Sequence, residues 1–391
     1  MKWTFTLTIV YGRYADKVRF RCTRPNGCFG IPLTRMDIRF DDFAIIFILK
    51  NRTLTAWTFD TLIALLIKRD PSVQSLELND MYKLPALSDR HSDPATYPPG
   101  IAFMDGQYLP ISEAKISVLD NGFLHSDATY DVAHVWKGAF FRLDDHLERF
   151  FAGMEKLHMS IPFDRAEVTE ILHNCVALSG LKNAYVEFIC SRGTSPTFSR
   201  DPRDAVNRFI AFAIPFGSIA NPEQMRRGLH AAVTDLVRIP PSSVDPTVKN
   251  YHWLDLVKGL YAAYARGAET AILLDANGNI AEGPGFNVFA VKNGKISSPK
   301  FGVLMGITRQ TIFDLCEELQ ITCTTDDLEP NELRAADEVF VTSTAGGVMP
   351  VTKIDETSIG TGSVGPTTKE ITEAYWRMHE DDRFRQVIGY P

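Results

Sequence analysis

The sequence predicts an α+β fold built from two units, each of which mixes strands with helices. From about residue 101 onward, apolar residues at helical spacing alternate with short runs rich in β-branched and aromatic residues. Glycine-containing turns such as Asp105-Gly106 and Lys137-Gly138 separate several of these runs. Internal repeats and low-complexity tracts are not apparent, so a repeat architecture is not expected.

The first unit is expected over residues 101–218. Leu143, Leu147 and Phe150 recur at helical spacing, and a second helical pattern stops at Gly180, a residue type that favours a helix C-cap. The expected strands cover residues 102–109, 114–119, 131–136, 139–142, 186–190 and 209–214. The expected helices cover residues 143–158 and 165–179.

The second unit is expected over residues 219–391, after a linker at residues 215–224. Turns at Asp275–Gly278 and at Asn293-Gly294 separate strand patterns. The expected strands cover residues 229–237, 270–274, 287–291 and 338–342. The expected helices cover residues 253–266, 307–319 and 367–379.

Residues 1–100 have a different pattern. Two short apolar runs, at 43–49 and 61–67, lie outside any clear succession of strands and helices, and no group of residues suited to chemistry is present. We expect an N-terminal extension that is poorly ordered or not part of the native protein. A small extra domain and a dimer-contact arm are the alternatives.

Composition narrows the class of protein. The chain has 391 residues, of which 45% are hydrophobic and 23% charged, as in a soluble globular protein with a sizeable core. The net charge of −7 gives no basic footprint for nucleic acid, and no apolar run is long enough to span a membrane. Six cysteines without CxxC spacing suggest neither a metal site nor a disulfide framework, so we expect a cytoplasmic protein.

Lys249 is the first candidate for chemistry. It follows the turn-rich residues 242–246 and precedes Tyr251, His252 and Trp253 at the start of a helical pattern. Aromatic neighbours can desolvate an ammonium, which lowers its pKa and leaves the nucleophilic amine that a Schiff-base lysine needs. Taken alone, a solvated surface lysine is the more frequent interpretation.

Three later loops complement this lysine. Glu282 lies beside two glycines at a strand start, where backbone can approach a ligand closely. Residues 302–309 open a helix with Thr308, and residues 342–350 combine hydroxyls, including that of Thr344, with paired glycines; both suit a phosphate. Taken alone, the Glu282 loop is more often an ordinary turn with a solvated glutamate, the second loop is an ordinary helix cap, and the third is explained as well by a tight turn. Together, an amine, a carboxylate and two anion loops meet the requirements of pyridoxal 5′-phosphate.

Residues from about 102 to 379 resemble the class IV, or fold type IV, aminotransferases. Within that family they most resemble the (R)-selective amine transaminases, which are related to the D-amino-acid and branched-chain aminotransferases. The stretches that carry the resemblance are 122–132, 141–149, 245–250, 282–287, 306–309 and 344–347. The resemblance implies a two-domain fold and a homodimer with active sites near the interface; residues 1–100 are not covered.

The resemblance also implies roles for individual residues. Lys249 would form the Schiff base with the cofactor and shuttle the proton, and Glu282 would pair with the pyridine nitrogen. The phosphate would be held by Arg149, Ile307, Thr308 and Thr344. The substrate side would be lined by His125, Tyr130, Val132, Trp253 and Ala345. The alternatives are a core histidine and ordinary strand side chains for the first three of these, and core packing for Trp253.

One loop departs from the family pattern. Related amine transaminases carry a mobile-loop arginine that pairs with the carboxylate of the keto acid. In the corresponding loop, residues 192–203, Phe198 lies nearest the expected place and Arg200 follows two residues later. We expect Arg200 to contact the carboxylate of the acceptor if the loop bends suitably.

The implied reaction is a ping-pong transamination from a small-molecule primary amine of (R) configuration to a keto acid such as pyruvate. One alternative is a branched-chain or D-amino-acid aminotransferase, or a pyridoxal phosphate lyase of the aminodeoxychorismate type. A more distant alternative is a non-catalytic binding protein on the same scaffold. A dinucleotide-binding fold is disfavoured, because Gly283-Pro284-Gly285 lacks the third glycine and does not lead into a helix.

Overall fold

The computed structural model describes residues 97–391 and six short strands between Thr4 and Thr58. The chain divides into two compact units, Met1–Pro85 and Ala86–Pro391, which from here on are called the first and second unit. The second unit contains both of the α+β units predicted from the sequence. In the first unit the described strands pair antiparallel: β1 (Thr4–Thr8) with β2 (Arg19–Thr23), β3 (Ala44–Ile45) with β6 (Trp57–Thr58), and β4 (Ile48–Leu49) with β5 (Arg52–Thr53). The prediction of a poorly ordered or non-native extension over residues 1–100 falls largely outside the described residues.

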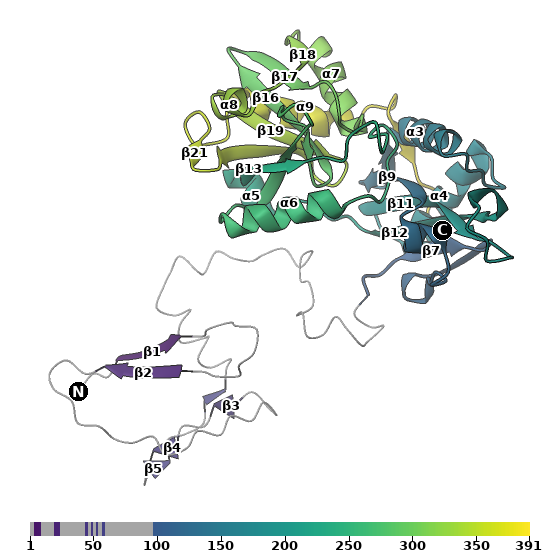
Figure 1. Cartoon of the computed structure of the whole chain (residues 1–391), viewed down its shortest axis with the longest axis horizontal. Helices are drawn as coiled ribbons and strands as arrows, with labels where there is room; N and C mark the ends of the chain where they lie inside the picture. The colour runs from purple at the N-terminus through teal and green to yellow at the C-terminus, as the bar shows by residue number, and fades with distance from the viewer. Residues whose placement is uncertain are drawn as a thin grey trace. The chain divides into compact units, whose positions relative to one another are not determined.

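The first sheet of the second unit is antiparallel, with seven described strands in the order β22-β10-β9-β11-β12-β7-β8. Figure 1 labels β9, β11, β12 and β7 of this sheet. Its strands are β7 (Ile101–Met104), β8 (Gln107–Pro110), β9 (Ala128–Trp136), β10 (Ala139–Phe141), β11 (Ala184–Thr194), β12 (Val206–Pro215) and β22 (Arg385–Val387). The short helices η5 (Ile111–Glu113), α2 (Asn121–His125) and η6 (Pro202–Asp204) lie in its loops. Because β22 pairs with β10, the end of the chain returns to this sheet.

One face of the first sheet packs against helices, and the other faces the candidate site. Helices α3 (Leu143–Lys156) and α4 (Arg165–Ser179) cover one face, where Phe150, Leu172 and Phe188 are fully buried in one core cluster. Side chains alternate along β11, so Tyr185 and Glu187 point to the opposite face. That opposite face carries one wall of the candidate site.

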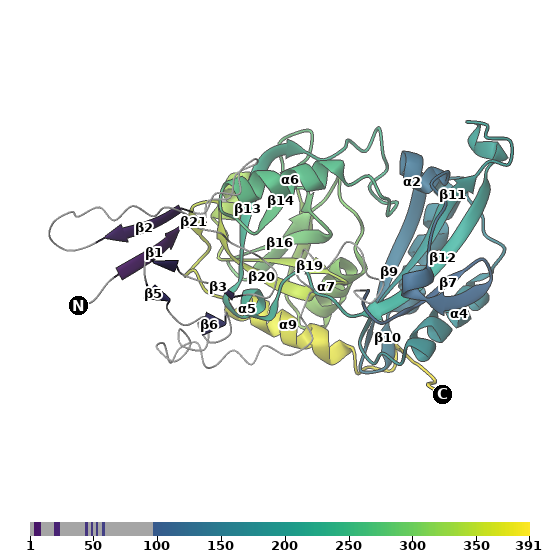
Figure 2. The same ribbon diagram turned by 90° about the horizontal axis from the view of Figure 1, so that it is seen from below.

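The second sheet is mixed and has nine described strands, in the order β14-β13-β20-β19-β16-β17-β18 with β15 and β21 at its margins (Figure 2). Its strands are β13 (Leu229–Val237), β14 (Thr270–Leu274), β15 (Glu282–Gly283), β16 (Phe286–Lys292), β17 (Lys295–Pro299), β18 (Cys323–Asp326), β19 (Glu338–Ser343), β20 (Gly347–Ile354) and β21 (Thr357–Ser358). Its helices are α5 (Pro222–Arg227), α6 (Leu254–Ala265), α7 (Ile307–Glu318), α8 (Pro330–Arg334) and α9 (Pro366–Met378).

Two groups of helices cover the second sheet. Leu256 of α6 packs with Ala232 of β13 and Ala271 of β14. Helices α7 and α9 pack elsewhere on the sheet, where Ile312 and Tyr375 join a separate core cluster. The mixed architecture confirms the predicted α+β fold.

Most predicted elements are present, but one predicted strand is wrong. Residues 114–119 form no strand; Ile116, Val118 and Leu119 are 48, 72 and 47% exposed. Alternation alone does not make a strand, because a strand also needs a partner whose backbone groups are free. Strand β20 was not predicted. It lies between β13 and β19 although it contains Pro350, a residue that argues against a central strand.

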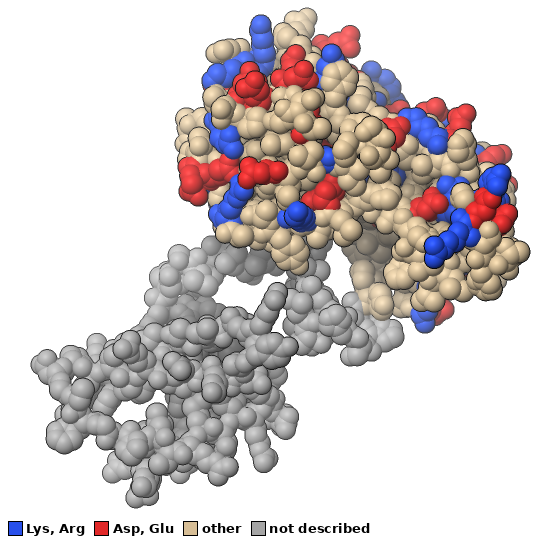
Figure 3. All heavy atoms as spheres, in the orientation of Figure 1, with Lys and Arg blue, Asp and Glu red and all other residues tan. Residues whose placement is uncertain are grey.

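The surface of the described part shows mixed charge. Basic and acidic side chains are interspersed on the face drawn in Figure 3. Within residues 97–391, no helix combines the length and the apolar character needed to cross a membrane.

Candidate active site

A cavity of about 450 Å³ lies in the second unit, between the open face of the first sheet and the loops of the second. This size is typical of sites for small ligands. The predicted residues that line it are Tyr130, Val132, Arg149, Lys249, Trp253, Glu282, Ile307, Thr308, Thr344 and Ala345. Residues far apart in the sequence therefore meet in one place.

Lys249 is fixed in the cavity by its backbone. Its carbonyl accepts hydrogen bonds from the N–H of Tyr130 at 3.1 Å and from Oγ1 of Thr129 at 2.9 Å, which ties the lysine loop to β9. Its Nζ lies 4.7 Å from the centre of the Tyr130 ring. Burial, together with the charge of Arg149, lowers the pKa of Lys249 to about 8. More uncharged amine is therefore present near neutral pH than in a solvated lysine.

Glu282 lies at the other end of the cavity on the short hairpin of β15 and β16. Its carboxylate accepts the N–H of Leu304 at 2.9 Å and two N–H groups of Arg238 at 3.1 and 3.0 Å. Burial raises the pKa of Glu282, and the charge of Arg238 opposes that effect. The hydrogen bonds fix the orientation of the carboxylate, which can still accept a hydrogen bond from a ligand.

Arg149 of α3 is held at the cavity by Asp131 of β9. Burial alone would raise the pKa of Asp131, but the charges and hydrogen bonds of Arg149 and His146 lower it below its ordinary value. His146 donates from Nδ1 to Asp131 Oδ1 at 2.8 Å, and Arg149 donates from Nη1 to the carbonyl of Met305 at 2.9 Å. A positive charge is thus fixed beside the first turn of α7.

The first turn of α7 has the features of an anion site. Its N-cap residue is Gly306, and no side chain caps the helix. A Cβ at Gly306 would lie 2.3 Å from Oδ1 of Asn287, so only glycine allows this close approach. Among the described residues, the buried Oγ1 of Thr342 lacks a hydrogen-bond partner. Free amides, a spare hydroxyl and Arg149 together fit the phosphate of the predicted cofactor.

Aromatic residues and one acid form the wall on the other side. The rings of Tyr130 and Tyr251 stack with centroids 4.3 Å apart. Tyr251 and Tyr185 donate their hydroxyls to Glu187 at 2.6 and 3.0 Å. Burial raises the pKa of Glu187, which the two tyrosine hydroxyls and then Lys249 partly oppose. A carboxyl group therefore lies close behind the aromatic wall.

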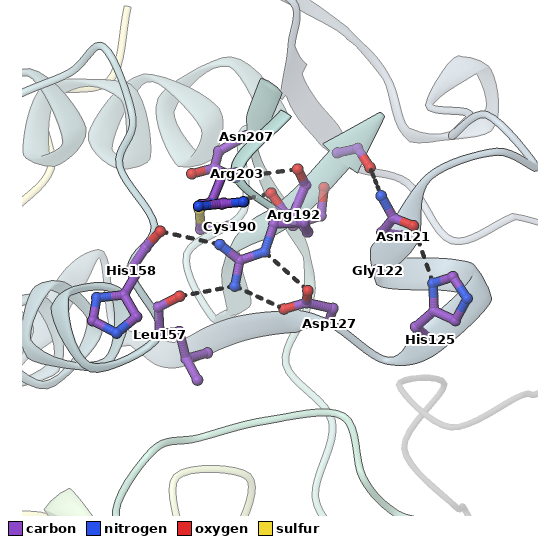
Figure 4. Close-up of polar contacts among 12 residues, drawn as sticks. Asn121, Gly122, His125, Asp127, Leu157, His158, Cys190, Arg192, Arg203 and Asn207 are labelled. Atoms are coloured by element: carbon purple, nitrogen blue, oxygen red, sulfur yellow. Dashed lines mark hydrogen bonds and ion pairs between the residues drawn. The ribbon is translucent and has the colours of Figure 1, made fainter. Parts of the chain in front are cut away.

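Two predicted site residues lie outside the cavity. His125 is exposed on α2, where its Nδ1 lies 3.0 Å from Oδ1 of Asn121 (Figure 4). Arg200 is exposed in the loop between β11 and β12. Arg192, near the end of β11, donates two hydrogen bonds to the carboxylate of Asp127 at 2.9 and 3.1 Å, as Figure 4 shows. The substrate roles of His125 and Arg200 stay predictions.

Several residues at the site were missed from the sequence. Arg238, Thr342 and Tyr185 line the cavity, and Asp131 and Glu187 support residues that do. A signal was available for Glu187, because an acid alternating with Val186 and Phe188 must point away from the core. For Arg238 there was none, since its partner Glu282 lies 44 residues further along the chain.

Comparisons with known proteins agree with this geometry. The sequence model of the family described as amino-transferase class IV matches residues 128–354. The chain belongs to the class IV aminotransferases. It is 30% identical over 276 residues to a putative branched-chain-amino-acid aminotransferase of Methanocaldococcus jannaschii, covering 70% of this chain and 94% of that protein. It is 29% identical over 273 residues to the D-alanine aminotransferase of Bacillus licheniformis, covering 69% and 94%.

Solved structures give the same family. A T.th. branched-chain amino acid aminotransferase with pyridoxamine 5′-phosphate superposes with a TM-score of 0.70 at 27% identity, covering 74% of this chain and 99% of that one. The Escherichia coli enzyme gives 0.71 at 25% identity, covering 74% and 100%. The predicted family, the fold type and the pyridoxal phosphate cofactor of this aminotransferase are confirmed. The (R)-selective subtype stays a prediction.

Proposed function

We propose that this aminotransferase takes its amino group from a primary amine of (R) configuration and passes it to a keto acid such as pyruvate. The observation that supports an amine donor is the distribution of charge at the cavity. Among the described lining residues, the arginines and lysines are Arg149, Arg238 and Lys249. Both arginines are already paired with carboxylates, and Glu187 adds an acid behind the aromatic wall.

This charge pattern disfavours a donor with a carboxylate beside its amine, except where Arg200 supplies a guanidinium, as it would for the alanine formed from pyruvate. Such a carboxylate would be repelled by the charge of Glu187 behind the aromatic wall and would find no unpaired guanidinium among the described lining residues. A donor with an aromatic or aliphatic group in that place would instead contact Tyr130 and Tyr185. The (R) configuration rests on the resemblance of residues 122–132 to the amine transaminases.

The roles of the residues follow from their positions. When bound, pyridoxal phosphate supplies an aldehyde that exchanges amine for carbonyl and a ring that withdraws electrons. Arg149, Thr342, Thr344 and the amides of Ile307 and Thr308 would hold its phosphate, and Glu282 its ring nitrogen. Lys249 Nζ, partly uncharged near neutral pH, can take the proton from the amine-bearing carbon of the donor and would deliver it to the carbon that carried the cofactor's aldehyde.

The keto acid needs a separate explanation, because it carries a carboxylate. We propose that Arg200 binds it when the loop between β11 and β12 folds over the cavity. Arg200 makes none of the ion pairs found in residues 97–391, whereas Arg203 of the same loop pairs with Asp201 at 2.5 Å. Arg200 would then bind a carboxylate in the half-reaction with the keto acid, and the half-reaction with the amine would not need it.

A second candidate is an aminotransferase of branched-chain or D-amino acids. The relatives favour it, since they are named branched-chain and D-alanine aminotransferases. The amine half-reaction alone, followed by the absorbance of the bound cofactor, with (R)- and (S)-1-phenylethylamine, D-alanine and L-leucine as donors and then with 2-oxoglutarate as the common acceptor, separates the two candidates. The proposal expects the highest kcat/KM for (R)-1-phenylethylamine; faster turnover of either amino acid would overturn it. Lys249→Ala is the matched inactive control.

We also propose a homodimer in the cytoplasm. Large apolar side chains are exposed on α2, where Phe123 is 64% exposed, and on α6, where Leu254 and Tyr261 are 85 and 71% exposed. Such surfaces are typical of subunit interfaces. His125 lies on α2 and could reach the cavity of a partner subunit. Light scattering measures the molar mass of the protein in solution. A fully active monomer would contradict the proposed homodimer. The free cysteines Cys175, Cys190 and Cys316 fit a reducing compartment.

A further inference from the structure

Three charged side chains form a chain at the edge of the cavity where Glu282 lies; Arg238 and Glu282 line the cavity, and Asp255 lies behind Arg238. Arg238 follows β13 and donates from Nε and Nη2 to Oε1 of Glu282 at 3.1 and 3.0 Å. Its Nη1 donates to Oδ2 of Asp255. The side chains of Arg238, Asp255 and Glu282 are 14, 12 and 8% exposed. Such weak exposure to water makes their mutual charges strongly felt.

Asp255 is fixed independently of this arginine. It lies in the first turn of α6, and its Oδ2 also accepts the N–H of Ile239 at 2.9 Å. Its Oδ1 accepts the N–H of Leu256 at 2.8 Å. A helix N-terminus favours a carboxylate, so Asp255 is well placed to balance the guanidinium.

The net charge of these three side chains affects the protonation of a ring nitrogen bound beside Glu282. Without Arg238, burial would favour the neutral form of Glu282, which cannot stabilise a protonated ring nitrogen. With Arg238 alone, the two charges would cancel. With Asp255 included, two carboxylates and one guanidinium leave one negative charge, which a pyridinium nitrogen of the bound cofactor would neutralise.

We propose that Arg238 and Asp255 are positioning residues that act through Glu282 by orienting its carboxylate and keeping one net negative charge at this end of the cavity. A bound pyridine ring therefore keeps its nitrogen protonated throughout turnover. The role does not depend on which amine is the donor, so it stands or falls separately from the proposed substrate.

The direct test is nitrogen NMR of the holoenzyme loaded with ring-¹⁵N pyridoxal phosphate and titrated with pH. In Asp255→Asn and Arg238→Met, the ring nitrogen should lose its proton at a pH about one unit or more lower than in the unaltered enzyme, which is a change of about tenfold in the protonation equilibrium. Arg334→Met is the control, because it breaks the ion pair of 2.7 Å with Asp355 away from the cavity. Unchanged titration in both site variants would overturn the proposal.

A purely structural role for Arg238 makes a different prediction. If Arg238 acts through Glu282, the losses of cofactor affinity caused by Arg238→Met and Glu282→Gln should not add in the double variant. Additive losses would overturn the proposal. Asp255→Asn keeps the shape of the side chain, and Arg238→Lys keeps a cation, so thermal unfolding of both apoenzymes separates misfolding from a change at the ring nitrogen. Arg238→Lys should recover part of the ring protonation that Arg238→Met loses.

Discussion

Arg149 and Asp131 form a two-point ion pair, with Nε 2.7 Å from Oδ2 and Nη2 2.8 Å from Oδ1. The pair joins α3 to β9, and the carboxylate of Asp131 is fully buried. The guanidinium cannot leave without stranding a buried charge, which is strongly unfavourable. The cation at the phosphate end of the cavity is therefore in place before any ligand binds.

Asp131→Asn should weaken both the fold and the binding of cofactor. Removal of one partner of a buried pair costs about 3–5 kcal/mol of unfolding free energy, which urea denaturation of the apoenzyme measures. Affinity for pyridoxal phosphate, measured by equilibrium dialysis, should fall with it, because Arg149 loses its fixed orientation. Glu380→Gln is the control, since it breaks only the exposed pair with Lys137 and should change neither quantity appreciably. Unaltered cofactor affinity in Asp131→Asn would contradict the assigned role of Arg149.

The same pair predicts a dependence of stability on pH. The pKa of Asp131 is lowered in the folded protein, although burial alone would raise it, because Arg149 and His146 stabilise the charged form. The stability from this carboxylate is fully present above its ordinary pKa and is lost as the pH falls below that value. Acid titration of the unfolding free energy should therefore be less steep in Asp131→Asn than in the unaltered enzyme. If the unfolding free energies of the two proteins fall equally steeply with decreasing pH, this prediction is contradicted.

Lys249 should react with acylating reagents at lower pH than other lysines of the apoenzyme. Burial and Arg149 lower its pKa to about 8, so its uncharged form becomes the major one above that pH. Competitive labelling with acetic anhydride, read by mass spectrometry across a pH series, gives the midpoint for each lysine. The exposed Lys295 serves as the comparison within the same sample. A labelling midpoint for Lys249 at or above that of Lys295 is the result that this expectation forbids.

Local chemistry made much of the fold predictable. Helix α4 was located because its helical pattern stops at Gly180, which adopts a left-handed conformation with φ of 71°. The structure adds a capping box of Asp164 and Glu167 at its start, which the prediction did not use. The strand expected at residues 114–119 failed because sheet pairing is a property of the neighbours and not of the segment. For the same reason β22, only three residues long, could not be foreseen on the first sheet.

The lining of the cavity was predictable where one short motif supplies it. Lys249, Glu282 and Thr308 each lie beside turn or helix-start residues that restrict the local backbone, and all three line the cavity, while their roles stay predictions. Arg238 and Asp255 act only through contacts over 44 and 17 residues of sequence, and local patterns do not encode such contacts. The spare hydroxyl of Thr342 was likewise visible only once β19 was paired with β16 and β20.

Glu187→Gln should relax discrimination against donors that carry a carboxylate. Removing the acid behind Tyr251 and Tyr185 removes a like charge, so kcat/KM for D-alanine relative to (R)-1-phenylethylamine should rise roughly tenfold, the change that about 1.4 kcal/mol of lost repulsion gives. Because burial raises the pKa of Glu187, the discrimination in the unaltered enzyme should grow as the pH rises and the acid ionises. The exposed Glu356→Gln is the control. A ratio of donors that is independent of pH and of Glu187 would refute this role.

Arg200→Ala should raise the KM for pyruvate and leave the half-reaction with the amine unchanged. Arg200 would contact only the carboxylate of the acceptor, so its loss removes a charge-assisted hydrogen bond from one substrate and not from the other. Single-turnover measurements with the amine alone, followed by steady-state kinetics with varied pyruvate, separate the two effects. Arg203→Ala tests the specificity of the result, because Arg203 lies in the same loop but is paired with Asp201. If the KM for pyruvate is the same in Arg200→Ala as in the unaltered enzyme, the loop does not supply the carboxylate site, and the keto acid must bind through a residue of a partner subunit or through Lys249 and the cofactor alone.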